Sequence, residues 1–374
     1  MAQVRKGVHI NKWTTGAKNI VVNGRPGLVK SLDQNPEIFR LKEAQGFFYV
    51  ARRHFDKEAW FSPTPEANAE YLFSIMHREF KPYRQYMDCI LTPWNERAQR
   101  PHENAVVHAL AVRRFAQLAH EEGYKVGGPN FSVGNPEPEQ MNLWAETLSQ
   151  LDYFVLHEYW AALGPMCRFD RPYWVGRWKR LLDALPAASR KPIIFGECGI
   201  DNQLIGRSVD RAGWRDAEVS GATYAQQLQE FYDSLDPALV LGIAVFNSGD
   251  HDNQLWKSFE LETCTEFTDW LKAASATNPA PQPQPETPQP VETGDKPVLF
   301  NTNPANKAIY PPGALNQLAQ EKSWEFVSDE VTQNGPTGAN IVQATMVDRS
   351  QQPNKFYLVT WTPGFPKAAY LPLS

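Results

Sequence analysis

Two glutamates at the ends of apolar segments are the residues in this sequence best suited to chemistry. Glu96 follows an apolar run that begins at Cys89, and Glu197 follows the run PIIFG at 192–196. Two carboxyl groups about 5 to 5.5 Å apart can cleave a glycosidic bond with retention of configuration, because one protonates the leaving group while the other attacks the anomeric carbon. A single glutamate after a strand can instead cap a helix or form a surface salt bridge, and this alternative is weaker for the pair.

The elements that would position these glutamates repeat along the first part of the chain. Short apolar runs alternate with amphipathic stretches of helical period, which is typical of βα units around a parallel sheet. Eight such units in roughly 250 residues favour a (β/α)₈ barrel over an open doubly wound sheet. We expect strands at 7–10, 27–32, 47–53, 88–94, 125–129, 153–159, 192–197 and 241–247, and the clearest helices at 102–122, 137–150, 173–185 and 222–235.

This arrangement resembles the clan A glycoside hydrolases, barrel enzymes whose fourth strand ends in Asn-Glu and whose seventh strand ends in a second Glu. Trp94, Asn95 and Glu96 match the first signature, and the stretch FGECG around Glu197 matches the second. The resemblance covers the barrel and implies a retaining β-glycoside hydrolase with Glu96 as the general acid/base and Glu197 as the nucleophile. The sequence predicts no cofactor, and no metal because the HxxE/H patterns of zinc sites are absent. The expected substrate is an oligo- or polysaccharide, with internal cleavage favoured over cleavage from an end.

The same resemblance implies roles for neighbouring polar residues. Asn95 would hydrogen-bond the sugar 2-hydroxyl, an interaction that strengthens in the transition state. The sixth strand ends LHEYW, and in several families of the clan the tyrosine of such a His-x-Tyr pair donates to the nucleophile and keeps it ionised. His157 and Tyr159 share a strand face because their spacing is two. Packing against the top of the barrel is the alternative for both.

The third strand ends in YVARRHF and offers two arginines. An arginine at the floor of such a site commonly binds the nucleophile carboxylate and lowers its pKa. Arg52 and Arg53 point to opposite faces of the strand, so only one can do this, and Arg53 is slightly preferred. His54 is a further candidate at the rim. Asn130, after the fifth strand, could reach a substrate hydroxyl, but asparagine in such a loop is as often a turn former.

The eighth strand departs from the clan. In members of the clan this strand often ends in a tryptophan that lies beneath the sugar. In this sequence the run GIAVFNSGD places Phe246 and Asn247 at that point. Phe246 could supply part of the stacking surface, or Trp160 or Trp256 could enter from a loop. Trp94 is a further stacking candidate because it adjoins the Asn-Glu signature.

A proline-rich segment divides the chain. Six prolines occur among the thirteen residues 278–290, and such a run favours an extended spacer. A tethered module on a polysaccharide hydrolase raises the local enzyme concentration on the polymer, and a role in stability or assembly is the alternative. We expect a catalytic barrel over 1–274, a spacer over 275–295 and a small α+β or β-rich module over 296–374, with a helix at 312–322 and strands at 340–346 and 355–361.

The composition limits the kinds of binding partner that we expect. The 374 residues are 42% apolar and carry a formal net charge of -5 with a pI near 6.0, so a basic surface for nucleic acid is not expected. The start, MAQVRKGVHI, lacks the apolar stretch of a secretory signal, and no segment has the apolar length to cross a bilayer. The four cysteines show no metal-binding spacing and predict no disulfide framework. The sequence indicates neither the cellular location nor the oligomeric state.

Two other functions fit parts of the pattern. A cell-wall lytic glycosidase of phage or bacterial type would use the same chemistry on peptidoglycan. A non-catalytic carbohydrate-binding barrel would have lost one carboxylate, and both are present here. The product profile on defined oligosaccharides and cell walls separates these functions.

Overall fold

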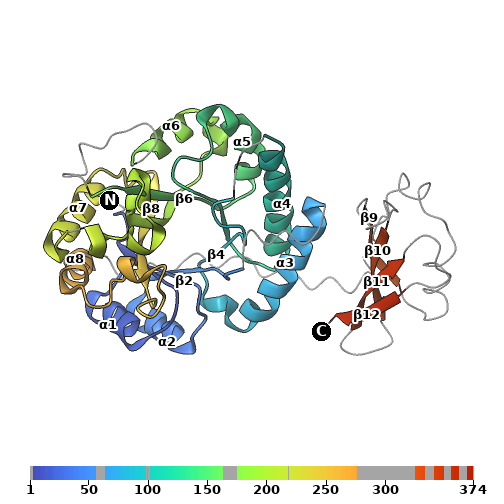
Figure 1. Cartoon of the computed structure of the whole chain (residues 1–374), viewed down its shortest axis with the longest axis horizontal. Coiled ribbons are helices and arrows are strands. Elements are labelled where there is room, and N and C mark those ends of the chain that lie inside the picture. Colours follow the sequence, from blue (N-terminus) through green and yellow to red (C-terminus); the bar gives the residue numbers. More distant parts are fainter. Residues whose placement is uncertain are drawn as a thin grey trace. The chain divides into compact units, whose positions relative to one another are not determined.

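The computed structural model describes residues 3–55, 64–97, 99, 102–162, 175–217 and 219–275, together with the backbone of four strands between 325 and 373. The chain divides into two compact units, Met1–Pro283 and Gln284–Ser374 (Figure 1). Residues 276–295 of the proline-rich spacer and the helix expected at 312–322 lie outside the described residues.

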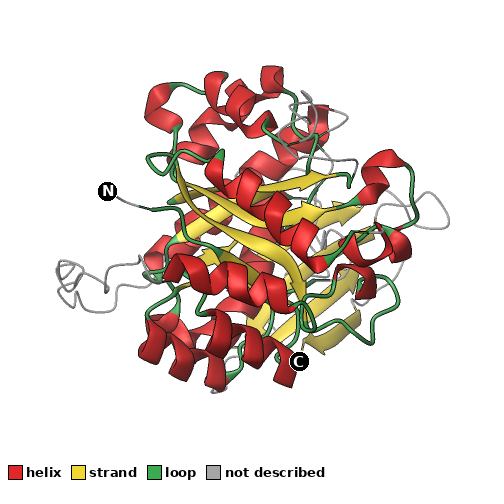
Figure 2. Ribbon diagram, turned by 90° about the vertical axis from the view of Figure 1, so that its left-hand side faces the viewer, coloured by secondary structure: helices red, strands yellow, loops and turns green. Residues whose placement is uncertain are grey.

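The first unit is a closed barrel of eight parallel strands that pair in sequence order, with β8 returning to β1. Its helices surround the strands (Figures 1 and 2). The predicted (β/α)₈ barrel is therefore confirmed, and each expected strand is found within a few residues of its predicted position. The strands are β1 (Gly7–Ile10), β2 (Leu28–Ser31), β3 (Phe48–Ala51), β4 (Cys89–Leu91), β5 (Val126–Phe131), β6 (Tyr153–Trp160), β7 (Ile193–Ile200) and β8 (Val240–Ser248).

The helices begin and end where local chemistry favours it. In one of them, Asn35 accepts a hydrogen bond from the backbone of Glu37, Pro36 occupies the first turn, and Gly46 closes the helix in the left-handed conformation. The expected helix at 137–150 begins as a 3₁₀ turn over Pro138–Gln140. The helices are α1 (Thr15–Gly24), α2 (Pro36–Gln45), α3 (Pro65–Phe80), α4 (His102–Glu121), α5 (Met141–Ser149), α6 (Arg177–Asp183), α7 (Gly221–Asp233) and α8 (Thr265–Ser275).

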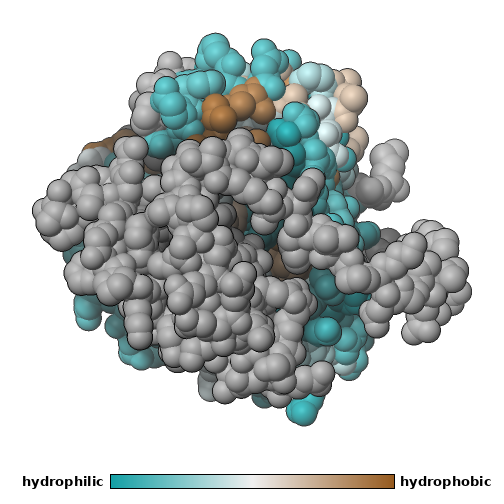
Figure 3. All heavy atoms as spheres, turned by 90° about the vertical axis from the view of Figure 1, so that its right-hand side faces the viewer, coloured by the Kyte–Doolittle hydropathy of each residue, from teal (hydrophilic) through white to brown (hydrophobic). Residues whose placement is uncertain are grey.

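On the face drawn in Figure 3 the described side chains are mainly hydrophilic, with a small apolar area. Within the described part of the chain, none of the helices combines the length and apolar character needed to cross a membrane. Cys89, Cys198 and Cys264 are buried free thiols, and Cys167 lies outside the described residues.

Two apolar layers hold the barrel together. The larger layer packs between the strands and the helices. The smaller layer fills the interior of the barrel, where alternate residues of neighbouring strands meet. We call this inner set the barrel floor, and it consists of Leu28, Val50, Cys89, Leu91, Val155, Ile194 and Ala244.

The second unit contains a four-stranded antiparallel sheet in the order β12-β11-β10-β9. The strands expected at 340–346 and 355–361 correspond to β10 (Ile341–Asp348) and β11 (Lys355–Trp361). The flanking strands β9 (Glu325–Thr332) and β12 (Ala369–Leu373) were not predicted. Both are edge strands, and acidic residues in β9 and a proline in β12 obscure the apolar alternation by which a strand is recognised.

Candidate active site

A cavity of about 400 Å³ lies at the carboxyl ends of the barrel strands, where the βα loops begin. Both glutamates selected from the sequence reach it. Its size is in the range usual for small-molecule sites. The lining residues are His9, Asn11, Leu32, Arg52, His54, Phe55, Asn95, Glu96, Ser132, Val133, Tyr159, Glu197, Asp201, Gln203, Phe246, Trp256 and Phe259.

Glu197 points into the cavity because β7 contains a bulge. Val155 of β6 pairs with Ile194, and both belong to the barrel floor, whereas the next inward residue, His157, pairs with Glu197. Gly196 is therefore the extra residue, and without it Glu197 would face the helices. A Cβ atom on Gly196 would lie 2.9 Å from Val155, so only glycine fits this position without a shift.

Two side chains hold the Glu197 carboxylate in place. Lys30 Nζ donates to Oε1 at 2.9 Å, and Tyr159 Oη donates to Oε2 at 2.9 Å. Burial opposes ionisation of Glu197, but His157, Lys30 and Arg52 around it hold its pKa well below the ordinary value. Glu197 is thus an ionised, oriented and almost fully buried carboxylate.

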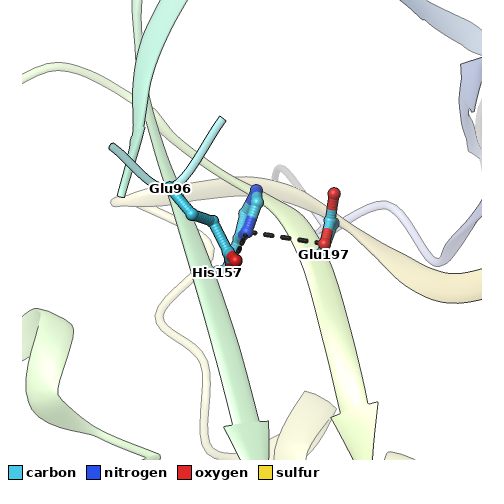
Figure 4. A group of neighbouring side chains, drawn as sticks. All are labelled: Glu96, His157 and Glu197. Atoms are coloured by element: carbon cyan, nitrogen blue, oxygen red, sulfur yellow. Dashed lines mark hydrogen bonds and ion pairs between the residues drawn. The ribbon is translucent and has the colours of Figure 1, made fainter. Parts of the chain in front are cut away.

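Glu96 lies opposite, in the loop after β4. Its backbone N–H donates to the carbonyl of Asn130 at 3.0 Å, and its side chain is 38% exposed. His157 Nδ1 lies 2.7 Å from Glu96 Oε1 and 3.5 Å from Glu197 Oε2, between the two acids (Figure 4). One oxygen of each glutamate and a nitrogen of His157 lie within 4.8 Å of one another. The two carboxyl groups therefore lie close to each other at the cavity.

Lys30 and His9 were not identified from the sequence. They are Cα partners on β2 and β1, both at most 1% exposed, and both side chains lie near Glu197. Burial lowers the pKa of Lys30 to about 8 and lowers the pKa of His9 well below its ordinary value. A lysine two residues after Leu28, in the inward series of an apolar strand, was the signal that could have identified this position.

The structure corrects the preference between the two arginines. Val50 belongs to the barrel floor and Tyr49 and Ala51 pack toward the helices, so alternation turns Arg52 inward and Arg53 outward. Arg52 lines the cavity and is 4% exposed. Arg53 forms an ion pair with Glu79, and its guanidinium lies 5.2 Å from the centre of the Phe55 ring.

The aromatic candidates separate into two groups. Phe246 and Trp256 line the cavity, with ring centres 5.6 Å apart, and Phe246 also packs edge-on against Tyr159. Trp94 and Trp160 are fully buried outside the cavity. Trp94 packs against His108 and Phe115, whereas Trp160 packs against Phe231 and donates to Gln227. These two rings support the barrel wall and cannot stack on a ligand in the cavity.

Some of the remaining polar candidates line the cavity, and others do not. Asn95 and His54 line the cavity. Asn130 instead donates from its amide to the carbonyls of Thr92 and Trp94, and so holds the loop that carries Glu96. The side chain of Asn247 donates to Asp250. Neither Asn130 nor Asn247 lines the cavity.

Several lining residues come from loops and carried no recognisable pattern. Asp201 and Gln203 follow β7, and Ser132 and Val133 follow β5. Loop residues have no periodicity, so their orientation does not follow from spacing. Asp201 accepts from the backbone of Gln203 at 2.9 Å, and burial raises its pKa.

Two groups of side chains in the described part of the chain have the geometry to hold a cation. The first is Glu96, His157 and Glu197. There the Lys30 ammonium already binds the Glu197 oxygen, and its charge opposes a second cation. The second is His251, Glu260 and Glu262. Both Glu260 oxygens accept backbone N–H groups of the surrounding loop, so this residue serves the loop.

Comparison with known proteins finds similarity in structure only. No protein family and no curated protein matches the sequence. A calcium-binding mutant of Bacteroides uniformis β-glucuronidase 2 superposes with a TM-score of 0.51 at 10% identity, covering 100% of this chain and 45% of that one. The same enzyme bound covalently to cyclophellitol-6-carboxylate aziridine gives a TM-score of 0.50 at 12% identity, covering 99% and 45%.

A GH39 β-xylosidase from Caulobacter crescentus gives a TM-score of 0.47 at 12% identity and covers 74% of this chain and 73% of that chain. The present chain spans less than half the length of the glucuronidase. At these identities the likeness establishes the barrel fold and nothing further.

Proposed function

We propose that this protein is a retaining β-glycoside hydrolase. The observation that carries the proposal is the pair of carboxyl groups with oxygens within 4.8 Å of each other, one buried and held ionised, the other partly open to the cavity. Similar glycosidase barrels support the same class. The expected substrate is an oligo- or polysaccharide that is cleaved internally.

In the first step, the Glu197 oxygen attacks the anomeric carbon. The bond to the leaving oxygen breaks, and that oxygen takes its electron pair and the proton of Glu96. Tyr159 and Lys30 keep the attacking carboxylate oriented and ionised before the step. The product is a glycosyl ester on Glu197 with inverted configuration at the anomeric carbon.

In the second step, water attacks the same carbon and releases Glu197. Glu96, now ionised, accepts the proton from this water, and the second inversion restores the original configuration. His157, which touches both glutamates, holds the two groups at the separation that both steps need. Asn95 is placed at the cavity wall to bind a sugar hydroxyl.

Replacement of Glu96 by alanine tests the roles of the two acids. General acid/base assistance contributes roughly 10²–10⁴-fold, so Glu96→Ala should lower the rate by that factor on substrates with poor leaving groups. Activated aryl glycosides should be affected much less in the first step, because their departure needs little proton assistance. Azide should restore turnover by attacking the glycosyl ester and should give a β-glycosyl azide from a β-linked substrate. An α-glycosyl azide, or an equal loss on all leaving groups, contradicts the assignment.

A substrate screen then identifies the polymer. Sugar release from glucans, mannans and xylans is compared with loss of turbidity of bacterial cell walls, each with wild type and Glu96→Ala. Cell-wall lysis without sugar release from the plant polymers indicates a peptidoglycan substrate. Activity on no carbohydrate contradicts the proposed function.

A further inference from the structure

We propose that Arg52 forms a subsite for an anionic substituent of the substrate, a carboxylate or a sulfate ester, so that the enzyme acts on an acidic glycan. This inference rests on the proposed function and names the substrate class of the same site. The guanidinium of Arg52 fits such a group because its planar fork can donate two parallel hydrogen bonds to an oxyanion.

The first observation is that Arg52 is buried at the cavity without a direct ion-pair partner among the described residues. The residue is 4% exposed and lines the cavity, and its Nε atom has no hydrogen-bond partner. No described carboxylate lies within ion-pair distance of its guanidinium. The neighbouring Arg53, by contrast, is paired with Glu79. An unpaired buried charge is costly, and buried charges are normally paired or bind a ligand.

The second observation is the charge balance of the site during the reaction. Before attack, Glu197 is ionised and Glu96 must hold a proton. After attack, Glu197 is a neutral ester and Glu96 is ionised. The two glutamates therefore carry one negative charge between them at each stage. Lys30 balances that charge through its hydrogen bond to Glu197, which leaves the charge of Arg52 in excess throughout.

The other groups in the cavity do not remove this excess. His9 is neutral near pH 7 because burial lowers its pKa. Asp201 lies after β7, across the barrel from β3, and the charged group that affects its pKa is Glu96. The charges felt by Arg52 are those of Glu197 and Glu96. An anionic group on the ligand would supply the missing counter-charge next to Arg52.

The alternative is that Arg52 only stabilises the ionised Glu197 at a distance. That role is independent of the substituents of the sugar, so loss of Arg52 would slow acidic and neutral substrates equally. A subsite would make the effect depend on the substituent. The two roles are therefore distinguished by the ratio of kcat/KM between acidic and neutral substrates, and not by kcat/KM on one substrate.

The experiment compares matched aryl glycosides with the same leaving group. The pairs are 4-nitrophenyl β-D-glucuronide and β-D-glucoside, the corresponding galactose pair, and the 6-sulfate of each neutral sugar. The variants are Arg52→Gln, Arg52→Lys, and Arg53→Gln as the matched control on the outer face. The kcat/KM of each variant is measured with each substrate.

For at least one sugar, the wild type should prefer an acidic form over the neutral form by roughly 100-fold, as expected for a desolvated charge pair. Arg52→Gln should abolish that preference. Any loss that comes from the support of Arg52 for the ionised Glu197 is common to the acidic and neutral forms and cancels in their ratio. Arg52→Lys should keep part of the preference, and Arg53→Gln should keep all of it. A preference for the uronide identifies a carboxylate, and a preference for the 6-sulfate identifies a sulfate. No acidic preference in the wild type, or equal losses on both forms in Arg52→Gln, overturns the inference.

Thermal unfolding and direct binding complete the test. Since the charge of Arg52 is unpaired in the free protein, Arg52→Gln should have a Tm equal to or above that of the wild type. A lowered Tm would show that Arg52 is structural and overturns the inference. If the wild type hydrolyses none of these glycosides and no carbohydrate of the substrate screen, the proposed function fails by itself. Calorimetric titration with D-glucuronate and D-glucose then decides: binding of glucuronate alone, lost in Arg52→Gln, supports the anion subsite, and no binding by the wild type overturns it.

Discussion

The floor and the mouth of the barrel are built by the same strands with opposite chemistry. Leu28, Val50 and Val155 belong to the apolar floor. Two residues further along the same strands stand Lys30, Arg52 and His157, all at most 4% exposed. Burial therefore does not distinguish the two layers. The difference is that the floor contains apolar side chains, whereas the mouth contains titratable groups that hold one another in position.

This contrast has an energetic meaning. Each apolar side chain in the floor stabilises the folded state as it leaves water. In the mouth, burial disfavours every charge, as the lowered pKa values of Lys30 and His9 show. Active sites retain such groups because perturbed ionisation is what the chemistry requires. We therefore expect floor variants to alter stability and mouth variants to alter catalysis.

The largest effect is expected at Glu197. Glu197→Gln removes the nucleophile and should lower kcat by roughly 10⁴-fold or more. The fold should persist, because Lys30, whose pKa is already lowered to about 8, can become neutral once its partner is gone. Steady-state kinetics and thermal unfolding measure the two properties. A large loss of both would mean that the mouth also holds the barrel together.

The next effect is expected in the floor. Ile194 is fully buried, and Ile194→Ala should lower the free energy of unfolding by about 2–5 kcal/mol through lost burial and an internal cavity. Denaturant titration measures this change, and kcat of the folded fraction should stay close to that of the wild type. Ile205→Ala is the control, because Ile205 is 42% exposed and its loss should change stability by less than about 0.5 kcal/mol. A large loss of kcat in Ile194→Ala would contradict the separation of the two layers.

A smaller effect is expected at Lys30. Its charge and hydrogen bond help hold the pKa of Glu197 below the ordinary value, so Glu197 stays ionised into the acid range. Lys30→Met leaves the carboxylate buried with less support, so its pKa rises and the acidic limb of kcat/KM moves to higher pH. A charge-assisted hydrogen bond of about 1.5–3 kcal/mol corresponds to a shift of roughly one to two pH units.

Tyr159→Phe is the matched control for Lys30, because it removes the other hydrogen bond to Glu197 without removing a positive charge. Its acidic limb should move in the same direction by a smaller amount. An unchanged acidic limb in Lys30→Met would show that Lys30 does not control the ionisation of Glu197.

The sequence predicted the positions of the strands better than the directions in which individual side chains point. Period-two and helical patterns identified the eight strands, because burial on one or both faces dictates apolar residues there. The same patterns could not show which side chains of YVARRHF face the barrel interior, since each of the two alternating series contains an arginine. Arg52 faces inward because Val50, two residues earlier on the strand, also does. The bulge at Gly196, which turns Glu197 inward, leaves no mark on the apolar pattern.

The tryptophans show a second limit. Trp94 and Trp160 adjoin site residues in the sequence, but both indoles pack in the barrel wall. Trp160 ends β6, where neighbouring residues point to opposite faces, whereas Trp94 lies in the loop after β4. Phe246 and Trp256 approach the cavity from β8 and the loop after it. The position of a loop depends on contacts that are distant in sequence.

The most direct test of the account is to trap the covalent intermediate. The wild type is incubated with 2,4-dinitrophenyl 2-deoxy-2-fluoro-β-D-glucoside and with the corresponding β-D-glucuronide, whose fluorine slows release of the glycosyl ester. Intact mass and peptide mapping then locate any adduct. The account predicts one sugar per chain, attached to Glu197 and absent in Glu197→Gln. An adduct on another residue, or turnover of the parent glycosides with inverted anomeric configuration, would contradict it.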